Sequence, residues 1–180
     1  ASIDELLMPY VEVLNKVNAK TGKGIYIPAG KEASVYAYYK DYTPAQFENE
    51  LLQEIYQYDC SARGFSYVGH ISSGKSAVIP QSATEDVIQS ASISHNSTLN
   101  LYATVFGGGS PITYHYQSIN GITVSWPSTF TGFHFGLTSA SYVLSSDKKT
   151  YTVTVNGSPQ NAAGLTQSVY LTENVTFTAN

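Results

Sequence analysis

The chain has 180 residues, a formal net charge of −4 at neutral pH, 42% hydrophobic residues and 12% charged residues. This length suits one domain, or one domain with a small subdomain, and the apolar content argues against disorder. Because the sequence has no basic stripe, we do not expect nucleic acid to be a partner. No apolar run is long enough to cross a bilayer, so we expect no membrane span.

The few charges are unevenly distributed. Val87–Ser146 contains no Asp, Glu, Lys or Arg, so solubility there depends on hydroxyl and amide side chains. This composition is commoner in exported β-proteins than on cytoplasmic surfaces, and it favours a secreted or cell-surface location. The chain begins at Ala1 rather than at Met, which fits the removal of a signal peptide. The single cysteine, Cys60, excludes a disulfide within the chain and favours a bacterial source.

The first segment has the pattern of an amphipathic helix. Ser2 followed by Glu5 is a capping box, and Gly22 is a suitable residue to end the helix. Pro9 lies inside the pattern, and we expect it to kink the helix or to move its start to about Met8. The apolar positions at helical spacing are Ile3, Leu6, Leu7, Tyr10, Leu14 and Val17.

A second helix is more strongly indicated. Thr43 is the expected N-cap, Pro44 suits the first helical position, and Gln46 completes a capping box. Its apolar stripe contains Phe47, Leu51, Leu52, Ile55 and either Tyr56 or Tyr58. The tyrosine-rich segment Ala33–Lys40 is ambiguous, and we favour a helix. Residues 1–63 are therefore predicted to form a helical N-terminal subdomain built as a helical hairpin.

From Phe65 onward the hydrophobic period changes to two, and Thr150–Asn156 is the clearest strand. Asn120-Gly121 is the strongest predicted hairpin turn, and Asn156-Gly157 is expected to end the clearest strand. The fold class we predict is α+β, with an antiparallel β-sandwich domain over residues 64–180. The expected strands are Phe65–Ile71, Ala77–Ile79, Val87–Ser94, Leu99–Phe106, Thr113–Ile119, Ile122–Trp126, Gly132–Leu137, Ser141–Leu144, Thr150–Asn156, Ser168–Thr172 and Asn174–Thr178.

One short motif matches a nucleotide-binding signature. Gly69, Gly74, Lys75 and Ser76 stand at the spacing of a phosphate-binding loop. That loop needs a following helix, but Ala77–Pro80 is β-branched and ends in proline. No later strand ends in an acid that would hold magnesium. Nucleotide binding is therefore only an alternative, and we read the motif as a turn between strands.

No constellation of residues predicts catalysis or a metal centre. His134 lies between two phenylalanines, so we expect it to point away from the apolar face; it would meet His115 only if their strands pair. A third metal ligand would still be missing. The surroundings of Cys60 match no cysteine-protease signature, and Asp147 and Glu173 are the only acids after Asp86. We expect no catalytic residues, no metal and no cofactor.

Aromatic residues make up 13% of the chain, and most of them should belong to the core. Four are nevertheless candidates for ligand binding, and these are Tyr114, Tyr116, Trp126 and Phe130. Tyr and Trp combine a flat apolar body with a polar edge, which suits stacking on sugars or contact with a protein. The prediction is a non-enzymatic binding module for carbohydrate or an extracellular protein. The loop Gly107–Pro111 leaves a protease-inhibitor-like interaction domain as a further alternative.

Two segments, Tyr42–Glu48 and Tyr142–Val155, give the chain a resemblance to small exported proteins of Gram-positive bacteria. In those proteins a short helical part precedes a β-sandwich rich in Ser, Thr and Tyr. The resemblance covers the layout of most of the chain. It implies secretion or residence at the cell surface, and it implies no particular activity or catalytic residue.

Overall fold

The structure is a computed structural model of the whole chain, and it describes residues 1–63, 70–72 and 83–179. The helices are α1 (Ile3–Thr21), α2 (Glu32–Tyr39) and α3 (Pro44–Arg63). The strands are β1 (His70–Ser72), β2 (Ala83–Ile93), β3 (Ser97–Gly108), β4 (Thr113–Ser125), β5 (His134–Leu144), β6 (Thr150–Gln160) and β7 (Leu171–Thr178). The expected strand Ala77–Ile79, and most of Phe65–Ile71, lie outside the described residues.

The ends of α1 and α3 follow from local sequence. Ser2 Oγ accepts a hydrogen bond from the amide of Glu5 at 3.2 Å, and Gly22 ends α1 in the left-handed conformation with φ 68°. Around α3, Thr43 and Gln46 exchange hydrogen bonds of 2.9 and 3.1 Å, which confirms the second capping box. The shift of the first helix start to Met8 is wrong. Helix α1 begins at Ile3 and carries Pro9 inside it, where proline removes one helical hydrogen bond.

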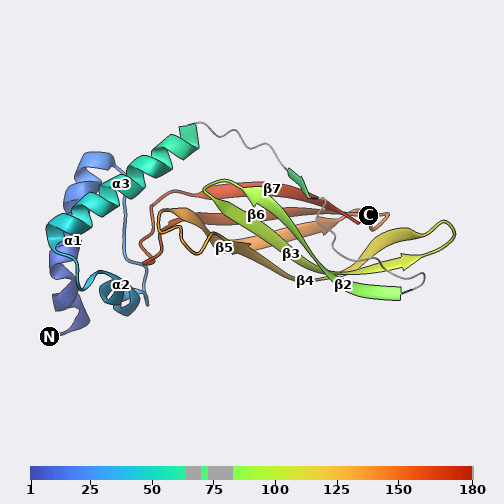
Figure 1. Cartoon of the computed structure of the whole chain (residues 1–180), viewed down its shortest axis with the longest axis horizontal. Helices are drawn as coiled ribbons and strands as arrows, with labels where there is room; N and C mark the ends of the chain where they lie inside the picture. The colour runs from blue at the N-terminus through green and yellow to red at the C-terminus, as the bar shows by residue number, and fades with distance from the viewer. Residues whose placement is uncertain (64–69, 73–82, 180) are drawn as a thin grey trace.

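The strands form two sheets, and the predicted α+β class is confirmed. One sheet has the order β1-β7-β6-β5, and the other has the order β2-β3-β4 (Figure 1). The pairs β2–β3, β3–β4, β5–β6 and β6–β7 are antiparallel, whereas β1 pairs with β7 in parallel. The core between the sheets contains inward-facing residues such as Leu99, Leu101, Val153, Val155 and Phe177.

Two predicted turns are wrong. Asn120-Gly121 lies inside β4, where Gly121 pairs with Tyr102 and Ile119 pairs with Ala103, so Asn120 is the extra residue of a bulge. Asn156-Gly157 lies inside β6, and Gly157 pairs with Leu137 on one side. In both cases the Asn-Gly pair lies within a strand and does not form a hairpin turn.

Strands expected as separate pieces are also continuous. Ser141–Leu144 and all of Gly132–Leu137 from His134 onward belong to the single strand β5, in which Thr138 is an extra residue opposite β6. Asn174–Thr178 and the end of Ser168–Thr172 belong to β7. The bulge allows β5 to remain paired along its whole length, which a strict alternation of apolar residues does not reveal.

The helical part has its own core, and the β-sandwich contributes to it. Phe47, Leu51 and Val17 are among the buried residues of this core, which also takes in Phe133, Ala163 and Leu165 from connections between strands. Tyr26 and Thr166 exchange backbone hydrogen bonds of 3.0 and 3.1 Å. The connection between β6 and β7 therefore packs into the helical part and joins it to one end of the sandwich.

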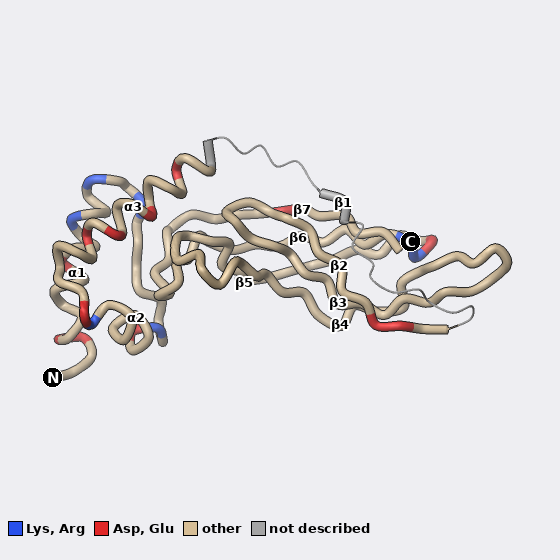
Figure 2. Tube along the Cα trace, in the orientation of Figure 1, with Lys and Arg blue, Asp and Glu red and all other residues tan. Residues whose placement is uncertain are grey.

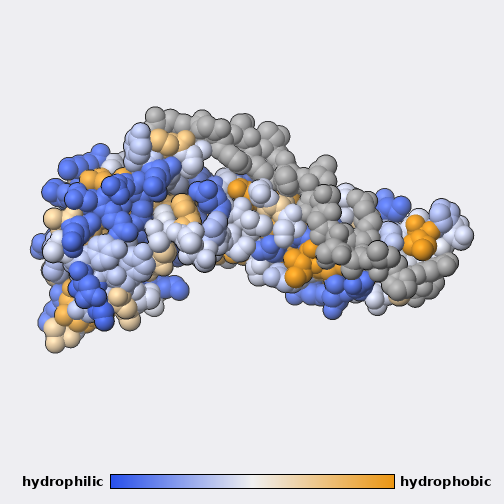
Figure 3. Space-filling model, viewed as in Figure 1, coloured by the Kyte–Doolittle hydropathy of each residue, from blue (hydrophilic) through white to orange (hydrophobic). Residues whose placement is uncertain are grey.

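The molecule is elongated, with the helices at one end and the strands running along the long axis (Figure 1). Most charged residues lie in the helical part, on the helices and their connections, and the strands are almost free of charge along most of their length (Figure 2). The helical end is correspondingly hydrophilic on the face in Figure 3. Of the helices that the structure describes, none is long and apolar enough to cross a membrane.

Candidate functional site

The four candidate aromatic residues do not form one surface. Tyr116 is completely buried in the sandwich core, where its hydroxyl donates to Gln89 Oε1, so it cannot contact a ligand in this conformation. Tyr114 is half-buried against the same core. Trp126 directly follows the opposite end of β4, and at ~3.3 Å per strand residue it is roughly 40 Å from Tyr114. Only Trp126 and Phe130 remain close together.

Trp126 opens the connection between β4 and β5. The amide of Phe130 donates to the carbonyl of Pro127 at 3.0 Å, which closes a turn directly after Trp126. The indole is 40% exposed, and it stacks on the imidazole of His134 with ring centroids 3.5 Å apart and an interplanar angle of 12°. A large ring supported on one face and open to solvent elsewhere is the arrangement needed to stack a flat ligand.

His134 is the main correction among the candidate residues. It was expected to point into solvent, but only 1% of it is exposed. The first residues of β5 are covered on both faces, because Phe135 packs in the sandwich core and Trp126 covers His134 on the other face. His115 lies in the other sheet, half-buried against Phe106, so the two histidines do not pair.

The environment of His134 fixes its charge. Burial lowers the pKa of His134 to about 4, and the backbone of Gly132 opposes that shift only in part. The imidazole is therefore neutral at neutral pH, with one nitrogen able to donate and the other able to accept. Among the described residues, neither ring nitrogen has a hydrogen-bond partner of good geometry, and both nitrogens are enclosed. An unsatisfied donor and acceptor in a buried ring are costly, so this end of β5 is locally strained in its polar contacts.

These two rings line a hollow of about 290 Å³ between α2 and the sandwich, which we call the Trp126 hollow. Helix α2 and the residue before it provide Lys31, Ser34 and Tyr38, and the end of β6 provides Gln160. The hollow thus combines the aromatic rings of Trp126 and Tyr38 with four polar groups. These are the ammonium of Lys31, the hydroxyl of Ser34, the amide of Gln160 and the imidazole of His134. Sequence analysis identified Trp126 but missed its neighbours, because α2 approaches it only in the folded chain.

A buried amide holds the wall of this hollow. Asn161 Nδ2 donates to Tyr39 Oη at 3.0 Å and to Glu54 Oε1 at 2.9 Å. Asn161 Oδ1 accepts from the amides of Ala163 and Leu165 at 3.1 and 3.0 Å. The side chain therefore links α2, α3 and the β6–β7 connection, and it fixes the position of α2 relative to Trp126.

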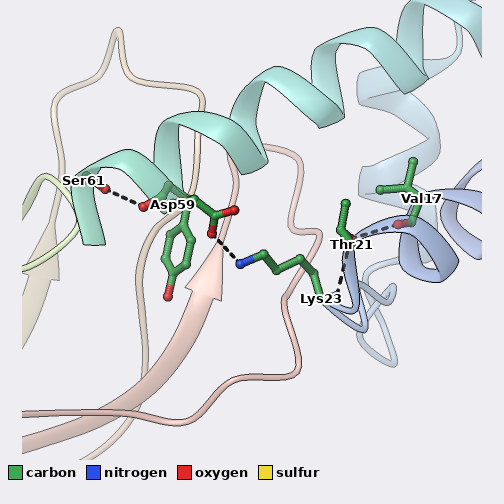
Figure 4. Close-up of polar contacts among 6 residues, drawn as sticks. Val17, Thr21, Lys23, Asp59 and Ser61 are labelled. Carbon is green, nitrogen blue, oxygen red and sulfur yellow. Dashed lines mark hydrogen bonds and ion pairs between the residues drawn. The ribbon is translucent and has the colours of Figure 1, made fainter. Parts of the chain in front are cut away.

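A second junction lies on the other side of the helical part. Lys23, between α1 and α2, forms an ion pair with Asp59 on α3, and its ammonium lies 5.3 Å from the centre of the Tyr58 ring (Figure 4). Thr21 Oγ1 donates to the carbonyl of Val17 at 2.8 Å and accepts from the amide of Lys23 at 3.4 Å, which positions the lysine (Figure 4). The end of α3 is thereby attached to the end of α1.

A serine, a histidine and a glutamate that lie near one another are not arranged as a catalytic triad. Ser94, His95 and Glu173 lie close together, but Ser94 Oγ donates directly to the Glu173 carboxylate. A serine nucleophile requires an imidazole between hydroxyl and carboxylate, and the His95 ring instead stacks on Tyr58. Cys60 is free and exposed on α3. In the part of the chain that the structure describes, no three His, Cys, Asp or Glu side chains cluster to hold a metal.

Most residues of the predicted nucleotide-binding motif lie outside the described part of the chain. Gly69, Gly74, Lys75 and Ser76 all lie outside the described residues. His70–Ser72, within the same motif, forms strand β1 beside β7. A phosphate-binding loop would need these residues in a turn that wraps the phosphates, so the extended backbone does not favour this alternative.

The fold and the hollow define an α+β protein in which a three-helix unit covers one end of a β-sandwich. No family model, curated protein or solved structure matches the chain.

Proposed function

We propose that the protein is an exported or cell-surface binding module that has no enzymatic activity and binds carbohydrate in the Trp126 hollow. The observation that carries the proposal is the stacked pair of Trp126 and His134. The imidazole of His134 supports one face of the indole, and the partly exposed indole offers an apolar surface for a sugar ring. A sugar hydroxyl can both donate and accept, so it suits the polar side chains around the indole better than an apolar ligand does.

The surroundings support the same class of ligand. Ser34, Tyr38 and Gln160 add polar groups around the indole, and pockets with a few convergent polar groups beside aromatic walls are typical of small-ligand sites. The charge-free stretch Val87–Ser146 supports the exported location. Fractionation of the native source tests that location, and recovery of the protein only from the cytoplasm would contradict it.

Trp126→Ala is expected to abolish binding to a glycan panel while the melting temperature falls by less than about 5 °C. The ring is partly exposed, and the loss of one stacking contact costs only about 1 kcal/mol. Binding is measured by calorimetry with the best glycan of the panel, and folding is measured by a thermal scan. A melting temperature lowered by ~10 °C or more would show instead that Trp126 serves the core.

Tyr170→Ala is the matched control, because Tyr170 is 73% exposed and does not line the Trp126 hollow. It should change neither glycan binding nor the melting temperature. Absence of any glycan binding by the wild-type protein would reject the carbohydrate proposal. If the protein captures an extracellular protein partner and the Trp126→Ala variant still binds that partner, the binding surface does not include Trp126.

The inhibitor alternative has one supporting observation. The turn between β3 and β4, which includes Ser110, Pro111 and Ile112, is exposed and lies at the end of the molecule opposite the helices (Figure 1). Ile112 is 42% exposed in this turn. A panel of serine, cysteine and metalloproteases tests the alternative, and a lack of inhibition of all three classes would remove its support.

A further inference from the structure

A second and larger cavity also involves the connection between β4 and β5, through Pro127. It has a volume of about 640 Å³ and lies where the sandwich meets the end of α3, and Pro127 stands at its rim. Its walls come from α3, the β2–β3 turn and the start of β7, and we call it the Glu173 cavity. This volume falls within the range of small-ligand sites.

The cavity contains a buried carboxylate. Glu173 occupies an inward-facing position of β7 and is only 6% exposed. The hydroxyl of Ser94 donates to Glu173 Oε1. Among the described residues, ion pairs join only Lys16 with Glu48 and Lys23 with Asp59, so none of these basic side chains neutralises Glu173. Burial raises the pKa of Glu173, and hydrogen bonds from the hydroxyl and the backbone of Ser94 oppose that shift. A cation in the cavity would offset the cost of keeping this buried carboxylate charged.

The β2–β3 turn, which forms another wall of the cavity, is polar and has an uncommon backbone conformation. His95 and Asn96 have φ angles of 62° and 56° in the β2–β3 turn. The His95 ring stacks on Tyr58 with centroids 4.6 Å apart, and its Nδ1 is enclosed without a hydrogen-bond partner. Ser97 Oγ donates to the carbonyl of His95 at 3.0 Å, which holds the turn. Left-handed residues other than glycine are often found at ligand sites.

We propose that the Glu173 cavity binds a hydroxylated primary amine of about the size of an amino sugar, in its ammonium form. The ammonium lies against the Glu173 carboxylate and supplies the missing counter-charge. The hydroxyls of the ligand face the serine hydroxyls of the wall. A neutral ligand would leave the carboxylate without a cation, and an anionic ligand would be repelled by it.

The test is a calorimetric titration of the full chain at pH 7 with glucosamine, glucose and N-acetylglucosamine as probes. These three probes differ at a single ring position, which carries an ammonium, a hydroxyl or an uncharged amide. Glucosamine is expected to bind saturably, and the other two at least ten times more weakly. The same order is expected in Trp126→Ala, so this result does not depend on the Trp126 hollow.

Glu173→Gln keeps the shape of the side chain and an oxygen that accepts from Ser94, and it removes the charge. It should weaken glucosamine binding at least tenfold. Asp86→Asn is the control, because Asp86 is an exposed acid of β2 that lies outside this cavity, and it should leave binding unchanged. Equal binding of the three probes, or no binding of glucosamine, would overturn the proposal without any variant. Undiminished glucosamine binding by folded Glu173→Gln would overturn it as well.

Discussion

Gly157→Ala is expected to lower the free energy of unfolding by about 3–5 kcal/mol, because a methyl group has no space at this position. A Cβ atom at residue 157 would overlap the carbonyl oxygen of Gly136 and would lie 2.9 Å from the Phe135 ring. Both neighbours belong to β5, which pairs with β6 on either side of this point. The backbone cannot move away without breaking strand hydrogen bonds.

Gly121→Ala is the matched comparison, since Gly121 also follows an asparagine within a strand. The nearest atom to a Cβ there is Tyr102 Cδ2 at 3.9 Å, an ordinary van der Waals distance. We expect a change within about 0.5 kcal/mol, because alanine restricts the unfolded chain and meets no clash. Urea unfolding followed by circular dichroism measures both variants. Equal losses of stability would contradict the close approach of β5 and β6 at Gly157.

Glu54→Gln is expected to raise the free energy of unfolding by about 2–3 kcal/mol at pH 8 and to have little effect at pH 4.5. Glu54 is 5% exposed, and burial raises its pKa from 4.5 to about 7, while the hydrogen bond from Asn161 opposes this shift. Glutamine keeps an oxygen that accepts from Asn161 Nδ2, so the network that holds the Trp126 hollow is preserved.

The sign follows from proton binding by Glu54 in the folded and unfolded states. Below pH 4.5 both states hold the proton, so the contribution of Glu54 to stability is fully present. Between pH 4.5 and about 7 only the folded state keeps the proton, and rising pH therefore favours unfolding. Above about pH 7 both states are ionised and the loss is complete. The difference between variant and wild type should grow across this interval and then become constant.

His134 changes stability with pH in the direction opposite to Glu54, and it does so in both the wild-type protein and the Glu54→Gln variant. Its pKa is lowered to about 4 in the folded state, so its contribution is present above pH 6.5 and is lost as the pH falls toward 4. Subtracting the wild-type curve from that of Glu54→Gln removes this shared effect. Glu12→Gln, which removes an exposed carboxylate of α1, should change stability by less than about 0.5 kcal/mol. A difference between Glu54→Gln and wild type that does not vary with pH would contradict the assignment to Glu54.

The sequence by itself determined the local features of this protein. Thr43 and Gln46 predict the start of α3 because a capping box involves only residues of one turn. Gly22 likewise predicts the end of α1, since the left-handed C-cap is a property of a single residue. The alternation in Thr150–Asn156 predicts a half-buried strand, and β6 has that burial pattern. The α+β class follows from the change of hydrophobic period after the helical segments.

Only the tertiary structure decided the features that depend on distant neighbours. An Asn-Gly pair suits a hairpin turn, a bulge or a close approach of two strands. Contacts with the facing strands make Asn120-Gly121 a bulge and Asn156-Gly157 a close approach. The alternation around His134 predicts exposure, but Trp126 covers the outer face of β5 at that residue. The Trp126 hollow and the Glu173 cavity arise where the helical part meets the sandwich. Their residues are far apart in sequence, and burial and unpaired polar atoms are properties of the assembled surface rather than of any local pattern.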